Sequence, residues 1–134
     1  MDDSPLLRAV DAVTVPVPDL DRGLAFYRDR LSHELLWRHD AVGQAGLRLP
    51  GSDTELVLTT EQSYAPNWLV TSVPEAVERV LAAGGTLLVE EAPIPVGRLA
   101  VVADPFGNAL VLVDLSAGRY ATDATGRVTR VDPT

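Results

Sequence analysis

Apolar and polar residues alternate in short stretches along most of the chain, a pattern typical of β-strands with one buried face. Within residues 12–17 valine occupies every odd position, while Ala12, Thr14 and Pro16 occupy the even ones. We therefore expect the valines to pack beneath a helix and the even positions to face the opposite side of a sheet. Similar patterns predict strands at residues 34–40, 45–49, 55–60, 68–73, 86–91, 99–103 and 109–115.

Two helices are expected between these strands. Asp19 suits the N-cap of the first helix, whose apolar face is formed by Leu20, Leu24, Tyr27 and Leu31. The second helix is expected over residues 74–83, because Pro74 suits a first turn and the glycine pair at 84–85 suits a C-terminal end.

These elements occur twice in the same order. Residues 12–19 (AVTVPVPD) are similar to residues 68–75 (WLVTSVPE), and residues 47–58 are similar to residues 101–112. The chain is therefore predicted to contain two βαβββ modules. The expected boundaries are a lead-in at 1–8, modules at 9–60 and 67–115, a linker at 61–66 and a tail at 116–134. A turn at 123–126 predicts a short hairpin or an extended arm in the tail.

Composition narrows the possible function classes. The chain has 134 residues, 46% of them hydrophobic, and a formal net charge of −8, so we expect a folded protein that binds neither nucleic acid nor an anionic membrane. All 11 basic residues are arginine and cysteine is absent, which excludes lysine Schiff bases, thiol nucleophiles and thiolate metal sites. No signal segment or membrane span is visible, so a cytoplasmic location is expected.

Three ordered motifs carry a resemblance to a known superfamily. They are VPDLDR at residues 17–22, AFYR at 25–28 and DPFGN at 104–108, the last followed by Leu-Val-Leu. Together with the repeat, they resemble the vicinal-oxygen-chelate superfamily of glyoxalases, bleomycin-resistance proteins and extradiol dioxygenases, over roughly residues 9–115. The resemblance implies an α+β fold in which two βαβββ modules form a curved mixed sheet around a cavity, usually in a homodimer.

The resemblance also implies where metal-dependent members would hold their ion. The equivalent positions in this chain are Ala12, Val57, Trp68 and Val111. A methyl group, two isopropyl groups and an indole offer no ligand to a divalent cation, and a one-residue change of register does not produce a four-ligand set. We therefore predict that the cavity has no metal site and needs no cofactor. His33 and His39 are expected to be ordinary polar residues.

Strand alternation predicts which side chains face the cavity. The candidate ligand-binding residues are Ala12, Thr14, Trp37, Arg48, Val57, Thr59, Trp68, Val70 and Val111. Trp37 and Trp68 would stack on a flat ligand, although core filling is the alternative for both. Arg48 interrupts an apolar strand and would anchor an anionic group, although a solvent-facing side chain is the alternative. No catalytic residue is identified.

The leading prediction is a protein of the glyoxalase and bleomycin-resistance type that binds a small aromatic or apolar molecule in a metal-free cavity, for sequestration or resistance. The alternative is a metal-independent lyase, isomerase or cyclase in which Thr14, Thr59, Ser72 or Arg48 polarises a carbonyl group. A metal-dependent glyoxalase or dioxygenase is the third reading. The sequence leaves open both the identity of the ligand and whether it is turned over.

Overall fold

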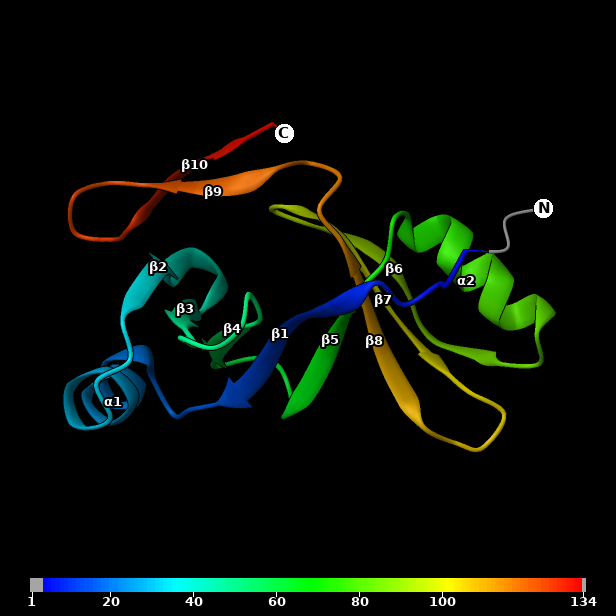
Figure 1. The fold of residues 1–134 in the computed structure, drawn as a ribbon, viewed down its shortest axis with the longest axis horizontal. Coiled ribbons are helices and arrows are strands. Elements are labelled where there is room, and N and C mark those ends of the chain that lie inside the picture. The colour runs from blue at the N-terminus through cyan, green and yellow to red at the C-terminus, as the bar shows by residue number, and fades with distance from the viewer. Residues whose placement is uncertain (1–3, 134) are drawn as a thin grey trace.

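The computed structural model describes residues 4–133, which form one curved eight-stranded sheet, two helices and a separate hairpin (Figure 1). The strands follow the order β2-β3-β4-β1-β5-β8-β7-β6 across the sheet. Their bounds are β1 Ala9–Pro16, β2 Leu35–His39, β3 Gln44–Arg48, β4 Glu55–Thr59, β5 Ala65–Leu69, β6 Thr86–Ile94, β7 Gly97–Ala103 and β8 Ala109–Asp114.

The sheet consists of two equivalent halves that meet at β1 and β5. These two strands are antiparallel, whereas β1 pairs in parallel with β4 and β5 pairs in parallel with β8. The remaining neighbours within each half are antiparallel. This arrangement confirms the predicted α+β fold with a curved mixed sheet.

The first helix begins as predicted and then widens. Asp19 caps α1 (Leu20–Leu24) by accepting a hydrogen bond from the backbone N–H of Arg22 at 2.7 Å. The chain continues as a π-helical segment, η1 (Ala25–Arg30), in which the N–H of Leu31 bonds to the carbonyl of Phe26. The wider turn rotates later residues away from the expected face. Leu31, predicted to be buried, is consequently 49% exposed.

The second helix, α2 (Val73–Ala82), is anchored at its N-terminal end by two side chains. Ser72 accepts a hydrogen bond from the N–H of Glu75 at 3.4 Å, and the buried carboxylate of Asp114 accepts one from the N–H of Val73 at 2.8 Å. The helix ends before Gly84, whose φ of +104° is the left-handed conformation expected at this position.

Each helix packs on its own half of the sheet and forms a separate apolar core. The first core contains Val15 with Val13 and Val17 around it, as the alternation predicts. The second core lies under α2 and contains Val70, with Trp68 packed against it. The opposite faces of both halves are therefore free to form a cavity.

The tail forms the hairpin that its turn motif predicts. Strands β9 (Arg119–Thr122) and β10 (Val128–Asp132) pair antiparallel, and Asp123 accepts hydrogen bonds from the N–H groups of Thr125 and Arg127 in the turn. Figure 1 shows this hairpin, in orange and red, extending past β2. Within residues 4–133 no helix is long and apolar enough to cross a membrane.

Candidate functional site

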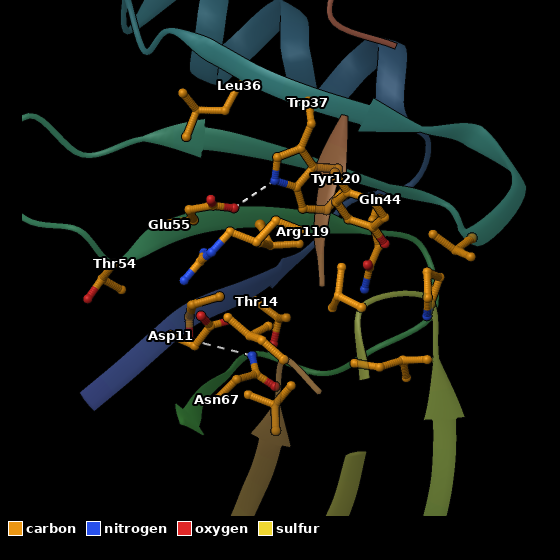
Figure 2. A pocket seen from close by; sticks show the side chains of 18 of the residues that line it. Asp11, Thr14, Leu36, Trp37, Gln44, Thr54, Glu55, Asn67, Arg119 and Tyr120 are labelled. Carbon is orange, nitrogen blue, oxygen red and sulfur yellow. Dashed lines mark hydrogen bonds between the residues drawn. The ribbon is translucent and has the colours of Figure 1, made fainter. Parts of the chain in front are cut away.

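A cavity of about 650 Å³ opens on the helix-free face of the sheet. Its walls come from β1 to β5, from β7 and β8, from residues 93–96 at the end of β6, and from β9 of the hairpin. Figure 2 shows the side chains that point into it from these elements. The volume is within the range of pockets that hold small organic molecules.

A β-bulge in β1 brings a carboxylate into this cavity. The pairing of β1 with β5 shifts between Val10 and Ala12, so that Asp11 is the extra residue. Both Asp11 and Ala12 consequently line the cavity, although strict alternation would send them to opposite faces. Opposite them on β5, Asn67 is 5% exposed and its side-chain amide donates to the carbonyl of Ala12 at 3.5 Å.

Trp37 reaches across one strand to a second carboxylate. Its indole N–H, on β2, donates to a carboxylate oxygen of Glu55, on β4, at 2.7 Å (Figure 2). Gly46 lies between them on β3, paired with Trp37 on one side and Val57 on the other. A Cβ at position 46 would clash with the indole nitrogen, so only glycine leaves room for this hydrogen bond.

The C-terminal hairpin forms an aromatic part of the cavity wall. The ring of Tyr120 packs on Trp37 with a centroid distance of 4.7 Å and meets the edge of His39 at 5.5 Å. Tyr120 and Val128 also pack against the small apolar cluster that Trp37 forms with two other cavity residues, Ala12 and Val57. Burial, together with the nearby charge of Glu55, raises the pKa of Tyr120 to about 12.

Two of the carboxyl groups that line the cavity, those of Asp11 and Glu55, have raised pKa values. Burial raises the pKa of Asp11, and the positive charge of Arg119 opposes that effect. Burial also raises the pKa of Glu55, although its hydrogen bond from Trp37 acts in the opposite direction. The negative charge of Asp11 raises the pKa of Glu55 further, which means that the two groups interact.

Five of the nine predicted ligand-binding residues lie in the cavity wall, namely Ala12, Thr14, Trp37, Arg48 and Val57. Two of these have their polar atoms engaged elsewhere. The hydroxyl of Thr14 donates to the carbonyl of Ser63 at 2.7 Å, and the guanidinium of Arg48 bonds to Glu34 at 2.6 Å. The hydroxyl hydrogen of Thr14 is therefore used within the protein, and the charge of Arg48 is paired with Glu34.

The other four predicted residues lie outside the cavity wall. Trp68 and Val70 belong to the core under α2, because the residue of β5 that pairs with Ala12 and faces the cavity is Asn67 and not Trp68, which reverses the expected alternation. Thr59 is 0% exposed, and its hydroxyl accepts hydrogen bonds from the N–H groups of residues 61 and 62. Val111 lies on the cavity side of β8, but Val113 lines the wall instead.

Pro66 explains why the start of β5 was predicted too late. A proline favours a linker or an edge strand because it cannot donate to a β-ladder. Here Pro66 pairs with Val13 on one side, and the pairing of β5 with β8 begins only at the next residue, Asn67. Proline is therefore accommodated at the start of an internal strand.

The side chains at the superfamily's metal positions do not form a metal site in this chain. With the corrected alternation these positions carry Ala12, Val57, Asn67 and Val111, which together offer one amide oxygen. Within residues 4–133 no group of three or more His, Asp or Glu side chains is arranged to hold an ion. The residues present therefore do not fit the metal that the resemblance implies.

Several cavity residues were missed by the sequence analysis. Glu55 shares the alternation of Val57 and could have been included on that ground, and Asn67 is one residue from the predicted Trp68. Asp11 reaches the cavity only through the bulge, for which the sequence carries no signal. Arg119 and Tyr120 lie in the tail, whose position over the cavity follows from tertiary packing.

Comparisons with known proteins agree with this architecture. A methylmalonyl-CoA epimerase from Mycobacterium tuberculosis has 22% sequence identity and a TM-score of 0.63, over 85% of this chain and 92% of that chain. A glyoxalase/bleomycin resistance protein/dioxygenase superfamily member from Vibrio splendidus 12B01 has 17% identity and a TM-score of 0.54, over 77% and 95%. These likenesses concern the fold.

No curated protein matches the chain. The sequence model of the glyoxalase-like domain matches residues 12–113, which is most of the chain and includes both halves of the sheet. The resemblance seen in the sequence motifs is thereby confirmed. The chain belongs to the glyoxalase-like domain family, within the glyoxalase/bleomycin resistance/dioxygenase superfamily.

Proposed function

We propose that this protein binds a small organic molecule with a flat apolar body in the cavity between its two modules, and that it does so with its own side chains. The observation that carries the proposal is the composite wall of Trp37 and Tyr120 beside a cavity of about 650 Å³. Aromatic side chains bind flat ligands through large contact areas at low entropic cost.

The rest of the wall supports a ligand of mixed character. Ala12 and Val57 form an apolar surface beneath the aromatic pair, and Leu99 and Val113 line the opposite half. The polar groups of Asp11, Asn67 and Glu55 are grouped together on β1, β5 and β4 (Figure 2). A mostly apolar pocket with a few convergent polar groups is the usual construction of a small-molecule site.

Tryptophan fluorescence tests this proposal, because the chain has two tryptophans and only one lines the cavity. In Trp68→Phe protein, titration with a panel of naphthoquinones, anthraquinones, flavonoids and indoles should quench Trp37 with a saturating one-to-one curve. In Trp37→Phe protein, the remaining Trp68 should report no such saturation. Equal quenching of the two variants, or no quenching by any compound, would contradict the proposal.

A second candidate function is metal-independent proton transfer, and the raised pKa values of Asp11 and Glu55 favour it. One carboxylate would take a proton from the carbon next to a carbonyl group, and the electron pair of the broken C–H bond would move to the carbonyl oxygen. Arg119, which lines the same cavity, would stabilise the negative oxygen. The carboxyl group would then return its proton to the carbon skeleton.

Deuterium exchange separates catalysis from binding alone. The protein is incubated with a metabolite extract in D₂O, and mass spectrometry looks for compounds that gain one mass unit. We expect such compounds with the wild-type protein and none with Asp11→Asn/Glu55→Gln protein if the second function holds. Identical spectra for the two proteins would leave binding as the function.

A further inference from the structure

We infer that the cavity selects ligands in which the flat body carries one positively charged amine or amidine, bound beside Asp11 and Glu55. This inference rests on the proposed function, since it names the class of molecule that the same cavity takes. It is carried by the position of the two carboxylates, by the absence of an ion pair to either of them and by the charge balance of the wall.

The two carboxylates come from adjacent strands. β1 and β4 are parallel, and Glu55 is the register partner of Ala12, the residue that follows Asp11. The bulge at Asp11 turns its side chain toward the same cavity as Glu55. Figure 2 shows both carboxylates facing the space that the aromatic pair borders. A single ammonium group has three donors and can reach two acceptors at once.

Neither carboxylate forms an ion pair with a residue of the described part of the chain, although the charge of Arg119 acts on both. Glu55 accepts one hydrogen bond, from Trp37, and Asp11 forms no ion pair or side-chain hydrogen bond with residues 4–133. Partly buried charges without partners are unfavourable, because burial removes water without replacing it. A ligand cation would supply the missing interaction and would lower both pKa values toward the ordinary range.

The chain itself places one cation beside this pair. Arg119, carried by the hairpin, lowers the pKa of both Asp11 and Glu55 through its charge, and Figure 2 shows its guanidinium extending between them. Arg119 is an exposed residue, and its side chain forms no ion pair with the described residues. One guanidinium against two carboxylates leaves one negative charge uncompensated.

The other charges in the wall increase this imbalance. Asp53 and Glu61 also line the cavity, whereas the second lining arginine, Arg48, is bonded to Glu34. The wall therefore attracts a cation and repels an anion.

Three naphthalene probes that differ only in charge test the inference by isothermal titration calorimetry. They are 2-naphthylmethylammonium, 2-naphthylmethanol and 2-naphthoate. We expect the ammonium to bind at least about tenfold more tightly than the alcohol, as is usual for a hydrogen bond to a charged partner. The carboxylate should bind most weakly of the three.

Two substitutions at the site and one control assign the preference to the carboxylates. Asp11→Asn and Glu55→Gln should each bring the affinities for the ammonium and the alcohol close together. Glu78→Gln removes the same charge from the exposed surface of α2, away from the cavity, and should keep the wild-type preference. Because the wild-type comparison needs no variant, the test does not depend on the folding of the substituted proteins.

The outcomes are distinct. Binding of the alcohol as tightly as the ammonium, or tighter binding of the carboxylate, would overturn the inference while leaving the cavity a binding site. Displacement of the ammonium by micromolar Ca²⁺ or Mn²⁺ would make the pair a metal site and would also overturn it. If none of the three probes binds, the proposed function itself is contradicted.

Discussion

Gly46 is the residue on which the position of Trp37 depends most directly. A Cβ there would clash with the indole nitrogen and lie 2.9 Å from the carboxylate of Glu55. We predict that Gly46→Ala displaces the indole, breaks its hydrogen bond with Glu55 and lowers the free energy of unfolding by about 1–3 kcal/mol. Urea unfolding and the emission maximum of Trp37 in a Trp68→Phe background measure these two effects.

Gly51→Ala is the matched control for this prediction. Gly51 lies in the turn between β3 and β4, and a Cβ at this position meets no atom within 4 Å. Alanine should therefore be tolerated, with unchanged emission and stability close to that of the wild-type protein. Equal effects of the two substitutions would show that Gly46 has no special role in placing Trp37.

The carboxylates of the cavity should reduce the stability of the folded protein at neutral pH. Burial raises the pKa of Asp11 and of Glu55, so the folded state binds their protons more tightly than the unfolded state does. Their contribution to stability is most favourable below the ordinary pKa and is lost as the pH rises through the raised value. We predict that Glu55→Gln raises the melting temperature at pH 7 by a few degrees.

The pH dependence provides the check on this prediction. Differential scanning calorimetry of wild type and Glu55→Gln should give melting temperatures that converge below about pH 4, where the ordinary glutamic acid is protonated. The amide can still accept the hydrogen bond of Trp37, so packing is retained. A lower melting temperature for the variant at pH 7 would mean that the charge of Glu55 stabilises the fold.

The charge of Asp114 has the opposite effect on stability, because hydrogen bonds stabilise the ionised carboxylate. Burial acts to raise the pKa of this carboxyl group, yet hydrogen bonds from Val73, Ser116 and Arg98 hold it below the ordinary value. The resulting stability is present above the pKa of the unfolded state and is lost as the pH falls through the lowered value. We predict that Asp114→Asn costs about 1–3 kcal/mol at pH 7, because it places a donor against backbone donors.

Denaturant unfolding of the Asp114→Asn protein at pH 7 and at pH 3 measures this contribution. The difference from the wild-type protein should be smaller at pH 3, below the ordinary pKa of aspartic acid, because the unfolded wild-type chain takes up a proton there and the stability that depends on the charge of Asp114 decreases. A difference that does not change with pH would show that the charge of Asp114 has little part in joining α2 to β8.

At the scale of elements, the C-terminal hairpin is the part of the cavity wall that lies beyond the family match. It lies outside residues 12–113, which the family model matches, yet it contributes Arg119 and Tyr120 to the wall. Its contacts with β2 include the backbone hydrogen bond from Arg38 to Gly126 at 2.8 Å and the packing of Tyr120 on Trp37, and Arg127 forms an ion pair with Asp40, the residue after β2.

We predict that a chain ending at Ala117 keeps its sheet but loses ligand affinity by about tenfold or more, since half of the aromatic wall is removed. The truncation retains Ser116, which bonds to Asp114. Circular dichroism should show retained secondary structure, while the emission of Trp37 should shift to longer wavelength as the indole becomes exposed. Full affinity in the truncated protein would show that the hairpin takes no part in binding.

The sequence predicted most elements of the sheet because their signals are local. The valines of β1, the Asp19 cap and the turn at 123–126 each act within a few residues. The start of β5 was predicted too late because the proline in its second position resembles a linker, and its alternation was wrong because the repeat equates Trp68 with Ala12, whereas Asn67 pairs with Ala12 in the sheet. Tertiary context therefore decided which residue of the pair Asn67 and Trp68 faces the cavity.

The candidate site was less predictable than the fold, and for a physical reason. The aliphatic and indole residues of the wall follow from strand alternation, which is why Ala12, Trp37 and Val57 were identified. The charged residues reach the cavity by a bulge, in the case of Asp11, and by long-range packing of the tail, in the case of Arg119. The predicted set of lining residues, in which Arg48 is the one charged member, therefore omitted the carboxylates that give the cavity its negative charge.

At the scale of the whole molecule, the two halves share a topology but differ in what they present to the cavity. The first half and the hairpin supply Asp11, Glu55 and Arg119, while the second half supplies mainly apolar residues such as Leu99 and Val113. The net charge of −8 extends the same preference beyond the cavity, because it raises the local concentration of cations around the protein. The repeated topology thus forms the walls of the cavity, and the residue differences between the two halves give the cavity its preference for cations.

The outer edge of the sheet leads to a prediction about assembly. β6 is the last strand of its half, and Leu87, Leu88 and Val89 on it are 39%, 53% and 52% exposed. An exposed apolar edge strand is a template for pairing with another chain unless it is covered. We predict a homodimer in native mass spectrometry, and we expect Leu88→Arg to shift it to monomer by placing a charge in the contact. A monomeric wild-type protein at micromolar concentration, or a dimer that Leu88→Arg leaves intact, would show that this edge does not mediate assembly.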